Sequence, residues 1–504
     1  MKKLISICLA TLMLLMLALP VAAEDILLIA PAPTSLPAKW DGTVAEAFAG
    51  GTGTEADPYL ITNARELALI AKNINTVTTD YAGIYFKQTA DINLDGAEWQ
   101  PIGNMSSTTS FKGVYDGADY TIYNMLAVGE YSGLFGWIAD SAVVQNLKLV
   151  GGSSTGKKYA GGVVGYMVGG TVYNCISELE SVVGDTLGGI VGRAEKGDMN
   201  TIKACVNHTD VTSAVGDTVA KNIFAGGIIG AAGNTQILYC ANYGNVTANA
   251  ATAYCLAGGI IGVQGASSGT VMIDNCMDMG IISATCADAN NVGAGGICGK
   301  AAHVSFSEIY NCFAVGTYTA VKENCAGGIA GFVDKAKFVT IENLYTSFET
   351  AAGADELAQL ANVSILRADA MKGTAGITKM GLSSAWIAQG PDMFPSIDVS
   401  KIDEAEKEPE APVTETTTAA TTTESTTAAT ETTTVTEKVT ETEPEATTAP
   451  VENENVDPTP EDKTETPDAP VETRDNTVWI IILAVAIVID GAAMAVVMLR
   501  RKKG

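Results

Sequence analysis

Cysteine is the residue of this 504-residue chain best suited to bind a metal or form covalent cross-links. One of the ten cysteines, Cys8, lies in an apolar leader. The other nine are spread along the chain at positions 175, 205, 240, 255, 276, 286, 298, 312 and 325. No two have the Cys-x-x-Cys spacing of a zinc site. Their odd number and regular recurrence favour buried thiols that pack as small apolar side chains. Disulfides stay open as an alternative, because an exported chain permits them.

Histidine occurs only twice, as His208 in "NHTD" and His303 in "AHVS". Neither belongs to a His-Glu-x-x-His motif, so the sequence does not indicate a metalloprotease. A Ser-His-Asp triad would have to use one of these two residues, and nothing around them supports one. We therefore expect both to lie in surface loops.

The segment "DINLDG" at 91–96 imitates the opening of a calcium-binding loop. The twelfth position of such a loop should be Glu, but here it is Ile102. Ile92 and Leu94 alternate with polar residues, which is typical of a half-buried strand that ends in a turn. We expect a strand and a turn here, without a metal.

Paired carboxylates are the serious enzymatic alternative, because they can act as general acid and base or bind calcium. The candidates are Asp116 and Asp119 in "YDGADY", together with Asp91 and Asp95. No acid recurs on one face of the repeats described below. We therefore predict no catalytic residue, no metal site and no cofactor. A protein that is not an enzyme is favoured, and a polysaccharide lyase or hydrolase is the alternative.

Sugar binding would need exposed aromatic rings. Before the C-terminal apolar run, tryptophan occurs at 40, 99, 137 and 386, and tyrosines include 159, 166, 173, 239, 243, 254 and 310. The sequence does not show which of these rings face solvent. The binding residues stay unknown at this stage.

All of these residues lie in a chain that repeats itself. The hexamer "AGGIIG" occurs at 225–230 and 257–262, with near-copies at 160–165, 187–192, 294–299 and 326–331. A quartet of the form Ile/Val-x-x-Cys follows each of the earlier hexamers, and "IENL" at 341–344 follows the last. Cys240, Cys276 and Cys312 recur every 36 residues, and we align "IYNM" at 122–125 and "VQNL" at 144–147 as earlier quartets. Self-similarity at this period indicates stacked repeats.

The apolar pieces of each repeat are short, rich in Ile, Val, Tyr and Thr, and interrupted by Gly and Asn, which predicts strands. Repeats that cannot bury their apolar side alone predict a β-solenoid, in which each turn pairs with the next at about 4.8 Å. We expect Ile, Val and Cys to form inward ladders. We expect Gly-Gly to make a corner with positive φ, and the Asn before the Cys to be left-handed.

These hexamers and quartets, with "YSGLFG" at 131–136, resemble the GLUG-repeat bacterial surface proteins, an adhesin-like group. The lead-in "GTGTEADPYLITNARELALIAKNI" and the closing "SSAWIAQGPDMFPSI" at 383–397 are also similar to those proteins. The resemblance covers about 50–397. It implies an all-β, right-handed parallel β-helix exposed on a bacterial surface, and it implies much less about the ligand.

Small helical caps are expected at the two ends of the solenoid. Asn63, followed by Glu66, resembles a capping box, and Leu67, Ile70 and Ile74 then fall on one helical face. This helix would cover the open edge of the first turn. The segment 353–366 would do the same at the far end.

The two termini predict export and anchoring. Residues 1–23 have the charged, apolar and small-residue parts of a signal peptide. The apolar run 478–499 is long enough to span the bilayer, and the basic tail 500–504 would stay in the cytoplasm. Between them we expect a lead-in and cap at 24–130, GLUG-like β-helix repeats at 131–345, a C-terminal cap at 346–400, and a disordered Thr/Glu/Pro-rich stalk at 401–477.

The formal net charge of −27 argues against a nucleic acid partner, because phosphate binding needs a basic surface. The sequence thus predicts a single-pass cell-surface protein with an extracellular body that serves adhesion or ligand recognition. Its partner would be an extracellular protein or glycan. A polysaccharide-active enzyme and a passive spacer are the alternatives.

Overall fold

The computed structural model of the chain describes residues 35–407, with internal gaps at 78, 96, 104–108, 196, 214–221, 251–253, 266–268, 287–291, 302–305, 323–324, 334–338 and 349–362. The predicted signal peptide, the transmembrane run, the basic tail and all but the first residues of the stalk lie outside the described residues. Within the described ranges, no helix is both long and apolar enough to cross a membrane.

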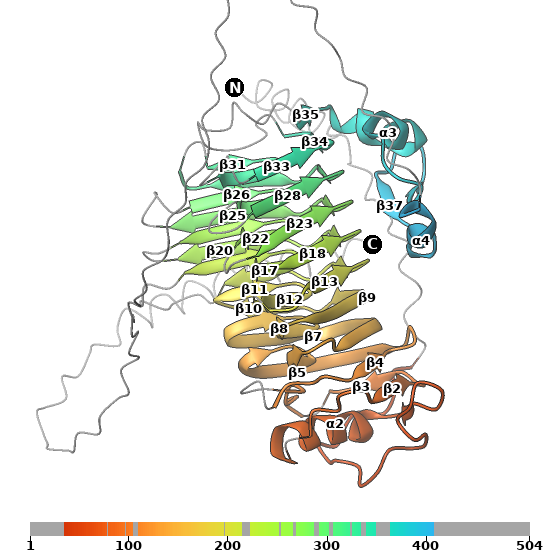
Figure 1. The fold of residues 1–504 in the computed structure, drawn as a ribbon. Coiled ribbons are helices and arrows are strands. Elements are labelled where there is room, and N and C mark those ends of the chain that lie inside the picture. Colours follow the sequence, from red (N-terminus) through yellow and green to blue (C-terminus); the bar gives the residue numbers. More distant parts are fainter. Residues whose placement is uncertain are drawn as a thin grey trace, which may run out of the picture. The chain divides into compact units, whose positions relative to one another are not determined.

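Stacked parallel strands form the body of the described chain (Figure 1). One sheet contains 28 strands, a second contains seven, and pairing in both is parallel. In the seven-stranded sheet the strands follow one another in chain order, one from each turn. The predicted all-β solenoid with few helices is confirmed. Its right-handed sense stays a prediction.

One complete turn shows the path of the chain. It passes through β13 (Asn200–Lys203), β14 (Val206–Asn207), β15 (Val211–Ser213), β16 (Ile223–Gly226) and β17 (Ile229–Ala232). Each of these strands pairs with the strand at the same place in the next turn. A residue therefore lies beside its counterpart in the neighbouring turn, and a sequence repeat becomes a row of like side chains.

The other strands fall into the same five rows. Beside β13 lie β9 (Gly170–Glu178), β18 (Thr235–Leu238), β23 (Thr270–Asp274), β28 (Phe306–Tyr310) and β33 (Val339–Glu342). Beside β14 lie β19 (Ala241–Asn242), β24 (Met277–Asp278), β29 (Phe313–Ala314), β34 (Leu344–Thr346) and β35 (Val363–Ile365). Beside β15 lie β10 (Ser181–Gly184), β20 (Val246–Ala250), β25 (Ile281–Cys286) and β30 (Thr317–Ala320).

The last two rows flank the glycine hexamers. Beside β16 lie β11 (Thr186–Gly188), β21 (Cys255–Gly258), β26 (Val292–Gly295) and β31 (Ala326–Gly327). Beside β17 lie β6 (Phe135–Ala139), β8 (Val164–Val168), β12 (Val191–Ala194), β22 (Ile261–Gln264), β27 (Cys298–Ala301) and β32 (Ala330–Val333). The first turns are built from β1 (Tyr59–Ile61), β2 (Tyr85–Gln88), β3 (Ile92–Asn93), β4 (Val114–Asp116), β5 (Thr121–Ser132) and β7 (Val143–Gly161).

The residue before the last position of each quartet is left-handed, as predicted. Its φ lies between +49° and +58° at Asn146, Asn174, Ala204, Tyr239, Asn275, Asn311 and Asn343. Several of the asparagines also bond along the stack, because Nδ2 of Asn174 donates to Oδ1 of Asn146 at 2.9 Å. Ala204 and Tyr239 adopt the same conformation without an amide. The path of the stacked backbone therefore requires this corner, and Asn is the side chain that suits it best.

The alignment of the quartet at 122–125 is wrong. Strand β5 places Ile122 beside Leu149 and Met125 beside Gly152, one corner further along the turn. The strand that lies beside the start of the 144–147 quartet is β4. The sequence pattern is the same and Asn124 is also left-handed, with φ of +56°, but the motif lies at the next corner of the turn.

The glycine pairs make a bend, but for a different reason from the one predicted. The φ angles of Gly226 and Gly227 lie outside the left-handed region. A Cβ on Gly227 would instead lie 2.1 Å from the carbonyl oxygen of Gly259 in the next turn, and one on Gly226 would lie 1.9 Å from the oxygen of Ile229. The hexamer recurs because backbone meets backbone at this bend, both within a turn and between turns.

The cysteines of the quartets form an inward ladder, as predicted. They continue a row of fully buried side chains, namely Leu147, Cys175, Cys205, Cys240, Cys276, Cys312 and Leu344. All nine cysteines of the described residues are buried free thiols. The apolar role predicted for them is confirmed, and no disulfide joins them in this structure.

The N-terminal helix α2 (Ala64–Val77) is capped much as predicted. Oδ1 of Asn63 accepts hydrogen bonds from the N–H groups of Arg65 at 3.0 Å and Glu66 at 3.3 Å. Glu66 reaches back to the N–H of Thr62 at 2.6 Å. The predicted apolar face, which includes Leu67, is fully buried in the main core beside the first strands.

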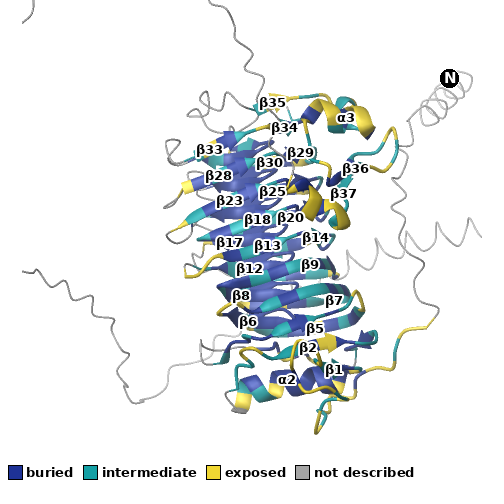
Figure 2. Cartoon of the chain, turned by 45° about the vertical axis from the view of Figure 1, so that its right-hand side comes forward, coloured by how far each residue is buried: buried dark blue, intermediate teal, exposed yellow. Residues whose placement is uncertain are grey.

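The segment after β35 packs along the side of the stacked strands (Figure 2). It contains η5 (Ala368–Met371), α3 (Gly373–Met380), the antiparallel pair β36 (Trp386–Ala388) and β37 (Pro395–Ile397), η6 (Val399–Lys401) and α4 (Ile402–Ala405). Trp386 packs against Phe313 with ring centroids 5.1 Å apart. Most of the helix predicted at 353–366 lies outside the described residues, and Val363–Ile365 form strand β35.

Replacement of Gly227 by Ala tests the close approach at the bend. Because the new Cβ would meet backbone and the Asn242 side chain, we expect the free energy of unfolding to fall by about 3 kcal/mol. The measurement is the denaturant midpoint of the purified chain. Gly390→Ala is the control, because its nearest atoms would be 3.7 Å away. Equal midpoints for the two variants would contradict this account.

Candidate functional site

Two rows of side chains face each other beside the glycine bend, outside the main core. The strands before the bend supply Tyr131, Tyr159, Thr186, Phe224 and Leu256. The strands after it supply Trp137, Tyr166, Arg193, Ala231, Val263 and Lys300. We call this double row the seam. In the middle turns it is filled by Ala231, Leu256 and Val263, which form a small buried cluster of their own.

In the first turns the seam is filled by four large rings, which we call the aromatic cluster: Tyr131, Trp137, Tyr159 and Tyr166. Tyr166 stacks on Tyr159 at 5.2 Å and on Tyr131 at 5.6 Å between ring centroids. Trp137 meets Tyr166 edge-on at 4.7 Å. Tyr131 is 9% exposed, and the other three rings are half-buried. The cluster therefore packs against itself and still reaches the surface.

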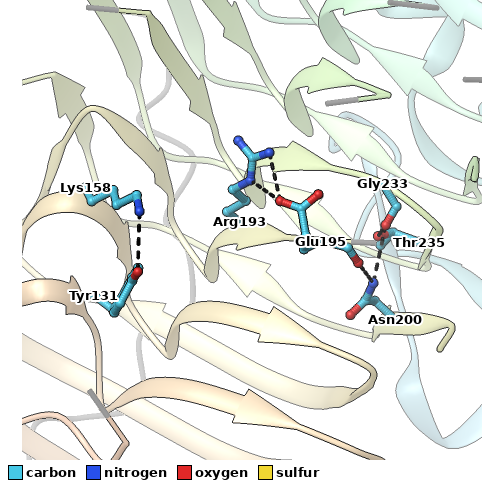
Figure 3. A network of polar contacts seen from close by, with 7 residues as sticks. All are labelled: Tyr131, Lys158, Arg193, Glu195, Asn200, Gly233 and Thr235. Carbon is cyan, nitrogen blue, oxygen red and sulfur yellow. Dashed lines mark hydrogen bonds and ion pairs between the residues drawn. The ribbon is translucent and has the colours of Figure 1, made fainter. Parts of the chain in front are cut away.

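Two cations lie over the Tyr159 ring. Figure 3 shows both of them, with the contact from Lys158 to the Tyr131 hydroxyl. The Lys158 ammonium is 5.3 Å from the Tyr159 ring centre and 3.5 Å from the Tyr131 hydroxyl. Arg193 lies 5.4 Å from the same Tyr159 ring. Its guanidinium is paired with Glu195 through Nε at 3.0 Å and a second nitrogen at 2.9 Å. Such cation–π contacts add to the packing and hold the rings in place.

The turn that carries Glu195 is tied to the body of the solenoid. The buried Asn200 side chain donates to the carbonyl of Glu195 at 2.8 Å and to that of Gly233 at 3.3 Å (Figure 3). Burial, with the nearby Glu195 charge adding to it, raises the pKa of Tyr166 above its usual value. The ordinary pKa of tyrosine, about 10, already lies above neutral pH, so this hydroxyl is a protonated donor there.

Sequence reasoning missed this cluster, although the repeats carry a signal for it. Tyr131 and Trp137 immediately flank the segment 132–136, and Tyr159 and Tyr166 immediately flank the hexamer 160–165. In this structure the aromatic residues on the two sides of each bend face each other, as Tyr131 and Trp137 do. Knowing the bend was necessary to read them in this way.

The four candidate carboxylates are held in structural hydrogen bonds. Asp116 accepts from the Ala118 N–H and from the Asn146 side chain, both at 2.9 Å. Asp119 accepts from Asn174 at 3.4 Å and is itself left-handed, with φ of +63°.

Asp91 accepts from the Thr121 N–H at 2.8 Å, and Asp95 pairs with Lys39 at 2.5 Å. The strand predicted within 91–96 is present as β3. The part of the chain that the structure describes contains no group of three or more His, Cys, Asp or Glu side chains that could hold a metal.

Of the two histidines, His303 lies outside the described residues. His208 lies just after β14 and stacks on Tyr243 with centroids 4.8 Å apart and planes 6° apart. Burial lowers its pKa. Its contacts are thus those of a packing residue on the surface of the solenoid.

Other aromatic residues that the sequence offered as candidates lie in the core or under the C-terminal segment. Trp40 and Trp99 pack edge-on at 5.7 Å in the first turns of the core. Tyr173 and Tyr239 lie under the C-terminal segment. The aromatic cluster combines several stacked rings, three of them half-buried, with paired charged groups.

A buried carboxylate was also missed. Asp278 is completely buried and continues an inward polar row in which Asn207 donates to Asn242 at 2.8 Å and Asn242 donates to Asp278 at 2.7 Å. The Tyr318 hydroxyl donates to its second oxygen at 3.1 Å. Burial raises the pKa of Asp278 to about 7 despite these donors. The sequence signal was an Asp in place of Asn, two residues after a quartet Cys.

No family model matches the chain. A "Putative Gly-rich membrane protein" of Evansella cellulosilytica is 34% identical over 113 residues, which cover 21% of this chain and 12% of that protein. "Halomucin" of Haloquadratum walsbyi is 34% identical over 172 residues, covering 31% of this chain and 2% of that protein. The chain thus matches only a small part of either relative.

A solved structure is also similar: the crystal structure of "a putative immunoglobulin A1 protease" from Bacteroides ovatus. It is 23% identical, has a TM-score of 0.48, and the match covers 70% of this chain and 95% of that one. The solenoid described here is established by its own strand pairing.

Replacement of Asp278 by Asn tests the buried carboxylate. The folded protein keeps this proton up to about pH 7, whereas an unfolded Asp loses it near pH 4. The folded state binds more protons between these values, so the free energy of unfolding falls as pH rises through this window. An asparagine at this position would continue the row of amides, and it has no carboxyl group whose ionisation would lower the free energy of unfolding. We expect D278N to be more stable than the wild type at pH 8 by up to about 4 kcal/mol, and equal to it near pH 4.

The measurement is the denaturant midpoint of both proteins from pH 4 to 8. Asp392→Asn is the control, because it removes an exposed carboxylate. If the difference between D278N and the wild type did not change with pH, Asp278 would not titrate as described.

Proposed function

We propose that this chain is a GLUG-type surface protein that uses its solenoid for adhesion or ligand recognition. In this proposal the run 478–499 anchors it in the membrane, and the acidic stalk holds the body outside the cell. The stalk was predicted to begin at 401, but α4 (Ile402–Ala405) is packed on the solenoid, so the stalk begins after this helix. The signal-like N-terminus, the basic C-terminal tail and the resemblance of the glycine repeats support this topology. One of the matched relatives is named as a membrane protein, which agrees with it.

The aromatic cluster is the observation that carries the recognition role. Tyrosine and tryptophan are enriched at binding surfaces, because they offer a large apolar face together with a polar group that reaches water. Here three such rings are half-buried on stacked, paired strands. A site built on rigid strands loses little conformational freedom when it binds.

A polysaccharide lyase or hydrolase is the second candidate. Asp116 and Asp119 remain its best residues, because they share one corner through Asn146 and Asn174. Their hydrogen bonds favour a structural role, so we propose binding without turnover. The passive spacer is the third candidate, and it requires that the aromatic cluster has no ligand.

Replacement of Tyr159 by Ala tests the recognition role. The full chain is applied to an array of immobilised polysaccharides and extracellular glycoproteins, and the amount bound is measured. Loss of the central ring should weaken binding about tenfold, because a stacked aromatic contact contributes on the order of 1 kcal/mol or more. Thermal unfolding of the same samples verifies that the variant is folded.

Tyr120→Ala is the matched control, because it removes an exposed tyrosine that immediately precedes β5, outside the aromatic cluster. Equal losses in the two variants would refute the site, and absence of binding by the wild type would favour the spacer. Release of uronate or reducing sugar that is lost in Asp116→Ala would replace the binding role by the enzymatic one.

A further inference from the structure

We infer that the ligand of the aromatic cluster is a neutral saccharide. The inference rests on the proposed function and adds the chemical class of the ligand. Three features of the site carry it: the geometry of the rings, the balance of charge around them, and the polar groups available at their rim.

The rings fit the flat apolar side of a pyranose. Tyr131, Tyr159 and Tyr166 are mutually close, with centroids 5.2 to 5.6 Å apart. The planes of Tyr159 and Tyr166 differ by only 21°. The rings stack on one another, and the C–H groups on one face of a sugar can pack against the parts of them that remain half-exposed. A long aliphatic ligand would instead require a deep groove.

The charges around the rings are paired. Arg193 is neutralised by Glu195 in a two-bond contact, with both side chains largely buried. Lys158 lies 4.0 Å from Glu130, and both are about half exposed.

The site therefore has no excess positive charge to attract an acidic saccharide. The chain as a whole carries a net charge of −27, which repels polyanions. Charge complementarity thus favours a ligand without charge. An ammonium ligand is also disfavoured, since the positive charges of Lys158 and Arg193 lie within 5.4 Å of the Tyr159 ring centre and would repel it.

The rim offers both donors and acceptors, which a polyhydroxylated ligand needs. Lys158 can donate, Glu130 can accept, and the Tyr166 hydroxyl stays protonated. The indole N–H of Trp137 has no hydrogen-bond partner among the described residues, although the atom is buried. A buried donor without a partner is costly, and a sugar hydroxyl that reached it would supply the missing acceptor.

The test compares neutral and acidic polymers that share one backbone. Binding of the full chain to dextran, hydroxyethyl cellulose and mannan is measured by biolayer interferometry, beside dextran sulfate and carboxymethyl cellulose. We expect at least one neutral polymer to bind at least fivefold more tightly than its charged counterpart. Tyr159→Phe keeps the ring and should stay within about threefold of the wild type, whereas Tyr159→Ala should lose about tenfold.

Trp137→Phe is the second variant, since it keeps an aromatic face and removes the N–H. We expect it to weaken binding to the neutral polymer about threefold, the effect of one hydrogen bond of modest strength. Leu126→Ala removes an exposed side chain elsewhere on β5 and should leave binding unchanged. Thermal unfolding again verifies that each variant is folded.

The outcomes separate the two proposals. Preference for the charged polymers, or binding of glycoproteins alone through protein contacts, would overturn the neutral-saccharide inference. The recognition role would survive in that case, provided that Tyr159→Ala still weakened binding about tenfold. If no polymer and no glycoprotein bound the wild type, both proposals would fall.

Discussion

The structure depends on the stacking of backbone on backbone, with each turn hydrogen-bonded to the next at a spacing of about 4.8 Å. Every turn must follow the path of its neighbours, so the residue at each position is constrained by those beside it. This constraint explains the left-handed corner at Asn174 and at Ala204 alike. It also explains Gly227, where the carbonyl of Gly259 leaves no room for a Cβ.

The repeats made much of this fold predictable. Quartets ending in Cys240 and Cys276 indicated inward ladders, and Asn63 with Glu66 indicated the capped helix. The reason for the glycine pairs was not predictable, because the close approach is between residues of different turns, which lie far apart in the sequence. The quartet at 122–125 was misplaced, since the same pattern with a left-handed Asn124 also occurs at a second corner of the turn.

The aromatic cluster escaped prediction for a related reason. In a continuous strand, alternation decides which side chains share a face. Tyr131 and Trp137 lie on opposite sides of a bend, so they face each other across the seam instead of standing side by side. Asp278 was hidden differently: its burial follows from its neighbours Asn242 and Tyr318, which lie in adjacent turns and not in adjacent sequence.

The C-terminal segment has a mechanical consequence. A solenoid ordinarily frays from its ends, because a terminal turn has only one neighbour to hold it. Here Trp386 contacts Phe313 and also bonds to Asn275 at 3.2 Å, while Glu406 reaches Lys203 at 2.8 Å. One short stretch of chain thus braces several turns at once. Under tension those turns would therefore have to unfold together instead of one at a time.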